Sequence, residues 1–300
     1  MKFTDKVLLS FFIISSQLLH AQSLEPRLYS NAPIGLNFLV AGYSYSSGAL
    51  PNIPELGLRD PNLKVDTTFL AYAHVFQAFG QSGKVDIILP FAKIHGTAYN
   101  ESNQILRRDV TDIADTKVRL AYNFFGSPAL SMKNYASYKQ DLIIGGSLQV
   151  TIPTGNYDAN KLVNISTNRW AIKPSLGVSK AIKSFLFECD IDAEFYTENA
   201  HYYGGSTKKQ DPLYSTQAHL IYNFKNGTWI GFDANYFWGG DYKIDGIYAQ
   251  KQLENSRLGA TLALPLNKTN SIKLYGSRGV VSRIGTNFDI FGFAWQYRWF

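Results

Sequence analysis

Four carboxylates alternate with apolar residues in the segment FLFECDIDAEFY, residues 185–196. Glu188, Asp190, Asp192 and Glu194 occupy every second position. Because a strand points successive side chains to opposite faces, the segment predicts a strand with one acidic and one apolar face. An acidic row could bind a cation or set the charge of a water-filled passage. Neighbours on one strand face lie about 7 Å apart, so the carboxylates do not converge as a metal site requires, and we expect no metal.

Histidines offer the other candidate chemistry. His74 and His219 are predicted to face the same side as the carboxylates, and His95 and His201 lie near the ends of predicted strands. No HExxH or GxSxG motif occurs. A hydrolase on the outer wall of a membrane barrel would need a histidine on that wall, and the predicted outer wall carries none. We therefore expect no catalytic residue and no cofactor.

The two-residue alternation recurs along the whole chain and predicts an all-β protein. Twelve segments show it: 35–47, 65–79, 84–97, 117–124, 142–152, 170–179, 185–196, 213–224, 230–238, 257–264, 270–280 and 291–299. Most exceed the roughly five or six residues usual in soluble sheets and match the tilted strands of membrane barrels. The single Cys189 lies on an apolar row and excludes an internal disulfide framework.

The predicted connections alternate in length. Short turns occur at 80–83, 180–184, 225–227 and 267–270, whereas longer polar loops follow the strands at 35–47, 84–97, 142–152, 185–196 and 230–238. Short periplasmic turns and longer extracellular loops are typical of an antiparallel outer-membrane β-barrel of about twelve strands. A soluble sandwich, the alternative for alternating strands, has no reason to show this asymmetry. The segment 126–138 lies on the turn side yet is long, and we predict a short helical or capping element there.

The N-terminus predicts export. Lys2 and Lys6 precede an apolar stretch from Val7 to Leu19, and Ala21 suits a cleavage site, so residues 1–21 are predicted to be a signal peptide. No later run approaches the roughly 20 apolar residues of a spanning helix. The chain has 29 Lys and Arg against 23 Asp and Glu, and the basic residues are dispersed, so no nucleic-acid partner is expected.

The alternation assigns side chains to the lumen of the predicted barrel. A row of charged residues is predicted to line it: Glu188, Asp190, Asp192, Glu194, Asp233, Lys117, Arg119, Lys173, Arg257, Lys273 and Arg298. Tyr72, Phe76 and Tyr275 are predicted to form an aromatic surface there, either for a solute or simply to fill space. Twelve strands predict a narrow lumen. Residues 34–300 are predicted to form the barrel, and residues 22–33 a periplasmic or plug segment.

Aromatic residues near predicted strand ends suit the two membrane interfaces. They are Trp170, Tyr222, Phe224, Trp238, Tyr297 and Trp299.

Several stretches resemble a known bacterial family. They are LYSNAPIGLNFLVAGYSYSSG (28–48), VDIILPFA (85–92), GSLQVTIPTGNYDANKLVNISTNRWAIKPSLGVS (146–179), DANYFWGG (233–240) and LENSRLGATLALPL (253–266). They are similar to the outer-membrane proteins of the meta-pathway of phenol degradation family, commonly described as transporters. The resemblance implies an outer-membrane barrel genetically associated with aromatic catabolism. The terminal WQYRWF also resembles the signal read by the barrel assembly machinery, with Phe300 one residue beyond the alternating aromatics.

The sequence thus favours a channel or transporter for small solutes, including aromatic or hydrophobic compounds, in the outer membrane of a Gram-negative bacterium. The expected partners are membrane lipid, the assembly machinery and a small solute. A lumen-filled structural or adhesive barrel is the first alternative. A surface hydrolase is the more distant one.

Overall fold

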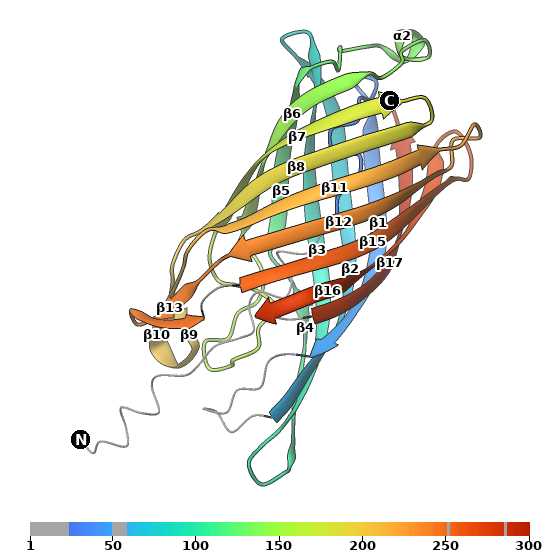
Figure 1. The fold of residues 1–300 in the computed structure, drawn as a ribbon. Coiled ribbons are helices and arrows are strands. Elements are labelled where there is room, and N and C mark those ends of the chain that lie inside the picture. Colours follow the sequence, from blue (N-terminus) through green and yellow to red (C-terminus); the bar gives the residue numbers. More distant parts are fainter. Residues whose placement is uncertain (1–23, 50–58, 251–252, 285–286) are drawn as a thin grey trace.

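The computed structural model describes residues 24–49, 59–250, 253–284 and 287–300. The predicted signal peptide lies outside these ranges. Strands dominate the described chain and slant around a common axis (Figure 1). Among the described residues, we find no helix whose length and apolar character would let it cross a membrane.

Twelve antiparallel strands close into a barrel, as predicted. They are β1 (Asn37–Ala49), β2 (Arg59–Ala78), β3 (Gln81–Tyr99), β5 (Thr116–Phe125), β6 (Leu142–Ile152), β7 (Ala171–Ile182), β8 (Phe185–Tyr196), β11 (Leu213–Asn223), β12 (Trp229–Gly239), β15 (Leu253–Pro265), β16 (Asn270–Ile284) and β17 (Asn287–Trp299). Each pairs with the next along the chain, and β1 also pairs with β17. The pairing of first and last strands removes both sheet edges, so lipid meets no unpaired strand.

One hairpin extends past the barrel rim. The first part of β3, from Gly83 to Ile88, pairs with β5, whereas its second part, from Phe91 to Tyr99, pairs with β4 (Ile105–Ile113). This hairpin projects from the end of the barrel opposite the C-terminus (Figure 1). The long loop predicted after residues 84–97 therefore contains an additional strand.

Two further loops combine into a small sheet at that same end. It consists of β9 (Asn199–Tyr202), β10 (Ser206–Gln210), β13 (Tyr242–Ile244) and β14 (Ile247–Gln250), with the short 3-10 helix η2 (Tyr203–Gly205) between β9 and β10. Lys208 belongs to β10 of this sheet, and its side chain is buried. Its Nζ lies 4.2 Å from the Tyr242 ring centroid and 5.3 Å from the Tyr202 ring centroid. Burial holds the pKa of Lys208 well below its usual range. The loops that were predicted only as long and polar are thus ordered around aromatic side chains.

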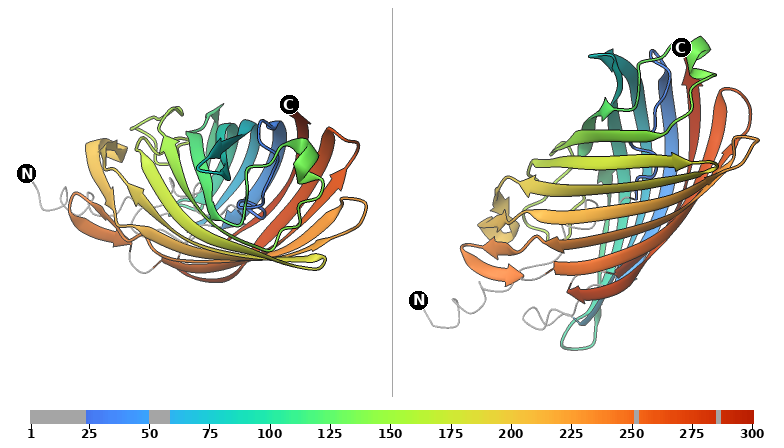
Figure 2. Two further views of the ribbon diagram at one scale, coloured as in Figure 1. Left: turned by 90° about the horizontal axis from the view of Figure 1, so that it is seen from above. Right: turned by 45° about the horizontal axis from the view of Figure 1, so that its top comes forward.

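The opposite rim carries the short helix α2 (Met132–Tyr135) and the C-terminus (Figures 1 and 2). The Ser131 hydroxyl accepts from the Asn134 N–H at the start of this helix. The Tyr135 hydroxyl donates to the carbonyl of Asn31, 2.9 Å away. The predicted helical element within 126–138 is confirmed, and it contacts the N-terminal segment.

The two faces of the barrel wall reverse the arrangement of a soluble protein. Exposed positions along the strands are apolar, among them Leu120, Leu148, Leu176, Phe187, Ile191, Phe232, Leu258 and Phe291. Buried positions are polar or charged, among them Gln149, Thr151, Ser179, Glu188, Gln217, Asn235, Asn255 and Thr261. An apolar outer band and a polar interior are what a lipid-embedded barrel requires.

Aromatic clusters mark both ends of the outer band. Tyr214 stacks on Trp238 with ring centroids 5.8 Å apart near the end that carries the small sheet. At the other end Tyr222 lies 5.0 Å from Phe185, and Tyr297 stacks on Trp299 at 5.5 Å. These positions suit the two interfaces between membrane and water.

The outward faces give a direct test of the lipid contact. Leu148 is 45% exposed near the middle of β6, and Leu148→Arg should cost about 2–4 kcal/mol because it places a charge in hydrocarbon. Ile105, 51% exposed, begins β4 on the projecting hairpin, so Ile105→Arg is the matched control and should be tolerated. The measurement is urea unfolding of protein reconstituted in lipid vesicles, followed by the heat-sensitive gel mobility of the barrel. Equal destabilisation by both changes would contradict the assigned membrane band.

Candidate functional site: the barrel lumen

Most of the predicted lumen charges have inward-facing side chains. Glu188, Asp190, Glu194, Asp233 and Arg257 are buried. Asp192, Lys117, Arg119, Lys173 and Lys273 are partly buried and have the inward parity of their strands. Acidic and basic groups therefore share one interior. Its field is divided between the two signs rather than uniform.

Arg298 differs from the other members of this row. It has the inward parity of β17 but lies at the strand end, where its side chain is exposed and Nε donates to the Lys268 carbonyl at 2.8 Å. The structure thus places Arg298 at the rim, where it holds the turn between β15 and β16. The prediction that it lines the passage is wrong because strand parity alone does not locate the end of the lumen.

The predicted aromatic surface of the lumen is reduced to one residue. Tyr275 faces inward and covers Gly292, whose added Cβ would meet the ring at 2.4 Å. Tyr72 instead faces outward, paired with exposed Leu39 and 6.2 Å from the Trp299 ring. Phe76 also lies on the outer face, over Gly83.

The error has a physical cause in β2. In the C-terminal half of β2, one face carries Phe69, Ala71, Ala73 and Val75. The other face carries Leu70, Tyr72 and Phe76. Both faces are mainly apolar, so hydropathy does not fix the phase of the alternation.

His74 shares the outward phase of Tyr72, which corrects the prediction that the outer wall has no histidine. Its Nδ1 lies 2.9 Å from Asn37 Oδ1, and the Tyr72 hydroxyl donates to the same oxygen at 2.7 Å. Its partner in register on β3 is Val85. These neighbours give His74 an orienting amide but no serine, threonine or cysteine to activate.

His219, by contrast, is inward, as predicted. It is buried, with Nδ1 2.6 Å from Asp233 Oδ1. The Thr261 hydroxyl donates to the other oxygen of that carboxylate at 3.0 Å. In the described ranges no group of three or more His, Cys, Asp or Glu residues is arranged to hold a metal ion.

The N-terminal segment before β1, residues 24–36, contacts the lumen charges directly. Arg119 on β5 pairs with Glu25 of this segment and, at 2.6 Å, with Asp86 on β3. The side chain of Arg119 is only 15% exposed. The guanidinium of Arg119 therefore binds two carboxylates, that of Glu25 in the segment and that of Asp86 on β3.

Arg27 extends this contact to the acidic row. Its backbone N–H donates to Glu188 Oε2 at 2.6 Å, and its guanidinium donates to Asn223. That guanidinium also lies over the Trp229 ring, 4.8 Å from the centroid. Glu188 on β8 thus serves as an acceptor for the segment instead of facing open water.

Tyr29 seats the segment against the wall of β6 and β7. It is 2% exposed, and its hydroxyl lies 2.9 Å from Ser175 Oγ. The ring occupies the space of missing side chains, because a Cβ added to Gly177 would lie 2.1 Å from the ring and one added to Gly145 would lie 2.7 Å away. Two inward glycines therefore form the groove that accepts this tyrosine.

The last residues of the segment leave the lumen at the rim that carries α2. Asn31 Nδ2 donates to the Pro128 carbonyl at 3.1 Å. The Ile34 N–H donates to the Leu130 carbonyl at 2.9 Å, and the Gly35 N–H donates to the Val75 carbonyl at 2.8 Å. The segment therefore runs from the rim that carries α2 into the barrel interior.

The loop 153–170 closes over the opposite mouth. Ile165 is buried in an apolar cluster with Leu63, Val65, Ala92, Ile94, Ala114 and Phe288. Asp115 is 2% exposed and accepts from the Ser166 hydroxyl at 2.6 Å and from the Thr167 N–H at 2.9 Å. Sequence reasoning missed Asp115, because its partners are 51 and 52 residues away and no spacing links them.

Comparison with solved structures confirms the fold, a closed β-barrel like those of outer-membrane proteins. The COG4313 outer membrane channel from Pseudomonas putida F1 matches with a TM-score of 0.78 and 20% identity, covering 92% of this chain and 100% of that one. The transport unit of the autotransporter AIDA-I from Escherichia coli matches with a TM-score of 0.52 and 11% identity, covering 98% and 96%.

The sequence model of one protein family matches residues 44–287. That family is described as "Putative MetA-pathway of phenol degradation". The chain belongs to this family, as the resemblance predicted. No curated protein matches it significantly.

The glycine groove predicts how the segment can be released. Gly177→Ala should displace Tyr29 and loosen residues 24–33, because the new methyl group overlaps the ring. Gly231→Ala is the matched control, since its Cβ would meet Ile221 at an ordinary 3.4 Å. With Cys189→Ala as background and Ser30→Cys as reporter, labelling by a membrane-impermeant maleimide should be faster only in the Gly177→Ala protein. An unchanged labelling rate would show that Tyr29 does not anchor the segment.

Proposed function

We propose that this protein is an outer-membrane channel for small solutes whose lumen is occluded at rest by its own N-terminal segment. The observation that carries the proposal is the placement of Glu25, Arg27 and Tyr29 against Arg119, Glu188 and Ser175 inside the barrel. A barrel with a purely structural role can fill its lumen with the side chains of its own strands. A separate chain segment inside the lumen therefore favours a channel. Polar contacts and the single ring of Tyr29 hold the segment in the lumen, and we propose that it leaves as one unit when the channel opens.

The domain organisation of the proposal follows the sequence prediction. A signal peptide of residues 1–21 directs export and is cleaved, residues 22–33 form the plug, and residues 34–300 form the barrel. The assembly machinery of the outer membrane is the proposed partner in biogenesis.

Small aromatic or hydrophobic compounds are the proposed solutes. The family description names phenol degradation, and the solved structure with the TM-score of 0.78 is that of an outer membrane channel. Tyr275 beside Lys273 remains an aromatic surface in the interior, with Nζ 5.7 Å from the ring centroid. We propose no enzymatic activity, because the neighbours of His74 among the described residues, Asn37, Tyr72 and Val85, include no serine, threonine or cysteine.

One observation favours the alternative of a lumen-filled structural barrel. Loop 153–170 packs Ile165 into the extracellular mouth, so both ends of the passage are narrowed. This alternative predicts no conduction with the N-terminal segment either in place or released.

Bilayer conductance tests the proposal. The mature protein should conduct weakly, and amides at Glu188, Asp190, Asp192 and Glu194 should shift its reversal potential in a salt gradient toward anion selectivity. Four negative charges are removed from a confined passage where charges act strongly, and the shift should shrink at high salt as screening increases. Glu101→Gln with Asp109→Asn, on the projecting hairpin, is the control for charges outside the lumen and should leave the potential unchanged.

Absence of conduction in both the native protein and Gly177→Ala would favour the structural barrel. An unchanged reversal potential in a conducting quadruple variant would show that the acidic row lies off the pathway.

A further inference from the structure

Two cationic side chains are buried together beside the mouth of the barrel that loop 153–170 closes. Lys208, on the buried face of β10 in the small sheet, is 1% exposed, and Arg169, at the end of the loop, is 4% exposed. Arg169 Nη2 donates to Gln210 Oε1, and Gln210 lies on the same face of β10 as Lys208. Burial lowers the pKa of Lys208, and the charge of Arg169 lowers it further. The fold thus brings two cationic groups together away from water.

Several hydrogen-bond donors around these cations are buried without an acceptor. Among the described residues, Arg169 Nε and Nη1 have no hydrogen-bond partner, and neither do the hydroxyls of Tyr202 and Tyr242. These two tyrosines flank Lys208 and are 2% and 1% exposed. A buried donor without a partner is costly, so an acceptor placed among these groups would stabilise the fold. Together, Arg169, Lys208, Tyr202 and Tyr242 form the mouth cluster.

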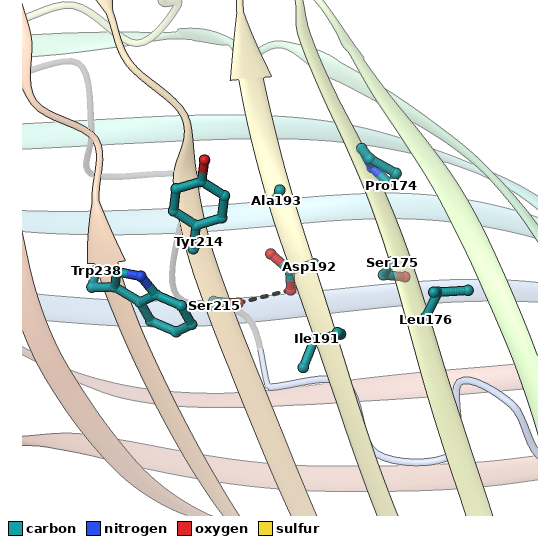
Figure 3. A pocket seen from close by; sticks show the side chains of 9 residues that line it. All are labelled: Pro174, Ser175, Leu176, Ile191, Asp192, Ala193, Tyr214, Ser215 and Trp238. Atoms are coloured by element: carbon teal, nitrogen blue, oxygen red, sulfur yellow. Dashed lines mark hydrogen bonds between the residues drawn. The ribbon is translucent and has the colours of Figure 1, made fainter.

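The carboxylates of the nearby barrel wall do not supply that acceptor. Glu194, at the end of β8, accepts from the Tyr196 hydroxyl at 2.9 Å. Asp192 accepts from the Ser215 hydroxyl at 2.7 Å (Figure 3). Burial lowers the pKa of Arg169, and Tyr196 and Glu194 oppose that fall only in part. In the described part of the chain, no carboxylate forms an ion pair with Arg169.

The mouth cluster joins two separate parts of this end of the barrel. Arg169 belongs to loop 153–170, whereas the other cation and the two tyrosines belong to the small sheet. The direct contacts between loop and sheet include neutral hydrogen bonds, such as that from Asn168 Nδ2 to Asn199 Oδ1 at 3.0 Å. A ligand held by Arg169 and by the sheet would therefore add a charged link between them and fasten the loop over the mouth.

We propose that the mouth cluster binds a small monovalent anion such as chloride, and that the bound anion fastens loop 153–170 to the small sheet. An anion accepts hydrogen bonds from N–H and O–H groups and neutralises cationic charge at the same place. A water molecule is also an acceptor, but it leaves the buried charge unbalanced. The four side chains are almost inaccessible, so a small anion suits them better than a phosphate or an organic carboxylate. The inference does not depend on the channel function proposed above.

Chloride NMR of the mature protein in lipid nanodiscs, in sodium gluconate buffer, tests the site. The native protein should broaden the chloride resonance, and the effect should saturate. Arg169→Gln should abolish this binding. Tyr202→Phe with Tyr242→Phe removes two donors while keeping the rings, and should weaken binding by about tenfold. Lys209→Gln is the matched control and should bind as the native protein does, because Lys209 lies on the other face of β10 with its side chain 68% exposed.

Trypsin cleavage reads the effect of the anion on loop 153–170, since Lys161 is exposed within it. Replacing gluconate by chloride at constant ionic strength should slow cleavage after Lys161 severalfold in the native protein and leave it unchanged in Arg169→Gln. Lys139, exposed near α2 at the opposite rim, is the internal control for effects of the salt on the protease.

Absence of saturable broadening in the native protein would overturn the proposal and show that water alone satisfies the mouth cluster. Native-like chloride binding by both the Arg169→Gln and the double phenylalanine proteins would also overturn it, because the ion would then be held elsewhere. Chloride binding without slower cleavage after Lys161 would refute the fastening of the loop. Heat-sensitive gel mobility shows whether each variant is a folded barrel. The double phenylalanine protein loses only hydroxyls that lack a partner, so it serves as the test if Arg169→Gln does not fold.

Discussion

The pairing of β1 with β17 is the constraint on which the rest of this structure depends. It runs without a shift from Asn37 opposite Trp299 to Ala49 opposite Asn287. In lipid every backbone N–H and C=O must find a partner within the protein, and a sheet can meet that demand only by closing on itself. Closure fixes which side chains face outward for the full length of every strand, since the alternation cannot change phase without a bulge.

A polar interior follows from closure, and with it the need to satisfy charges that are shielded from bulk water. Asp233 accepts from Thr261 and contacts His219, while Arg119 is neutralised by Asp86 and by Glu25 of the N-terminal segment. A buried charge without a partner is costly, so the segment that supplies Glu25 stabilises the wall as well as narrowing the passage. These contacts are polar, so water could replace them in the proposed release of the segment.

The sequence was most informative where the two strand faces differ strongly in polarity. In β8 the carboxylates alternate with Phe187, Ile191 and Phe195, so both the strand and its orientation could be predicted. In β2 both faces carry apolar residues, and Tyr72 and Phe76 were assigned to the wrong side.

Contacts between distant segments were beyond sequence reasoning. Arg119 and Glu25 are 94 residues apart, and Asp115 meets Ser166 across 51.

The central claim is that residues 24–33 close the lumen, and a reversible covalent lock tests it most directly. Ser30 Oγ and Ser179 Oγ both lie within hydrogen-bonding distance of Glu188 Oε1, at 3.5 and 2.9 Å. Cysteines at these two positions, in a Cys189→Ala background, can be joined by a short cleavable thiol cross-linker. Single-channel conductance should be lowest in the cross-linked protein. It should rise when the cross-link is cleaved. Identical conductance before and after cleavage would contradict the account.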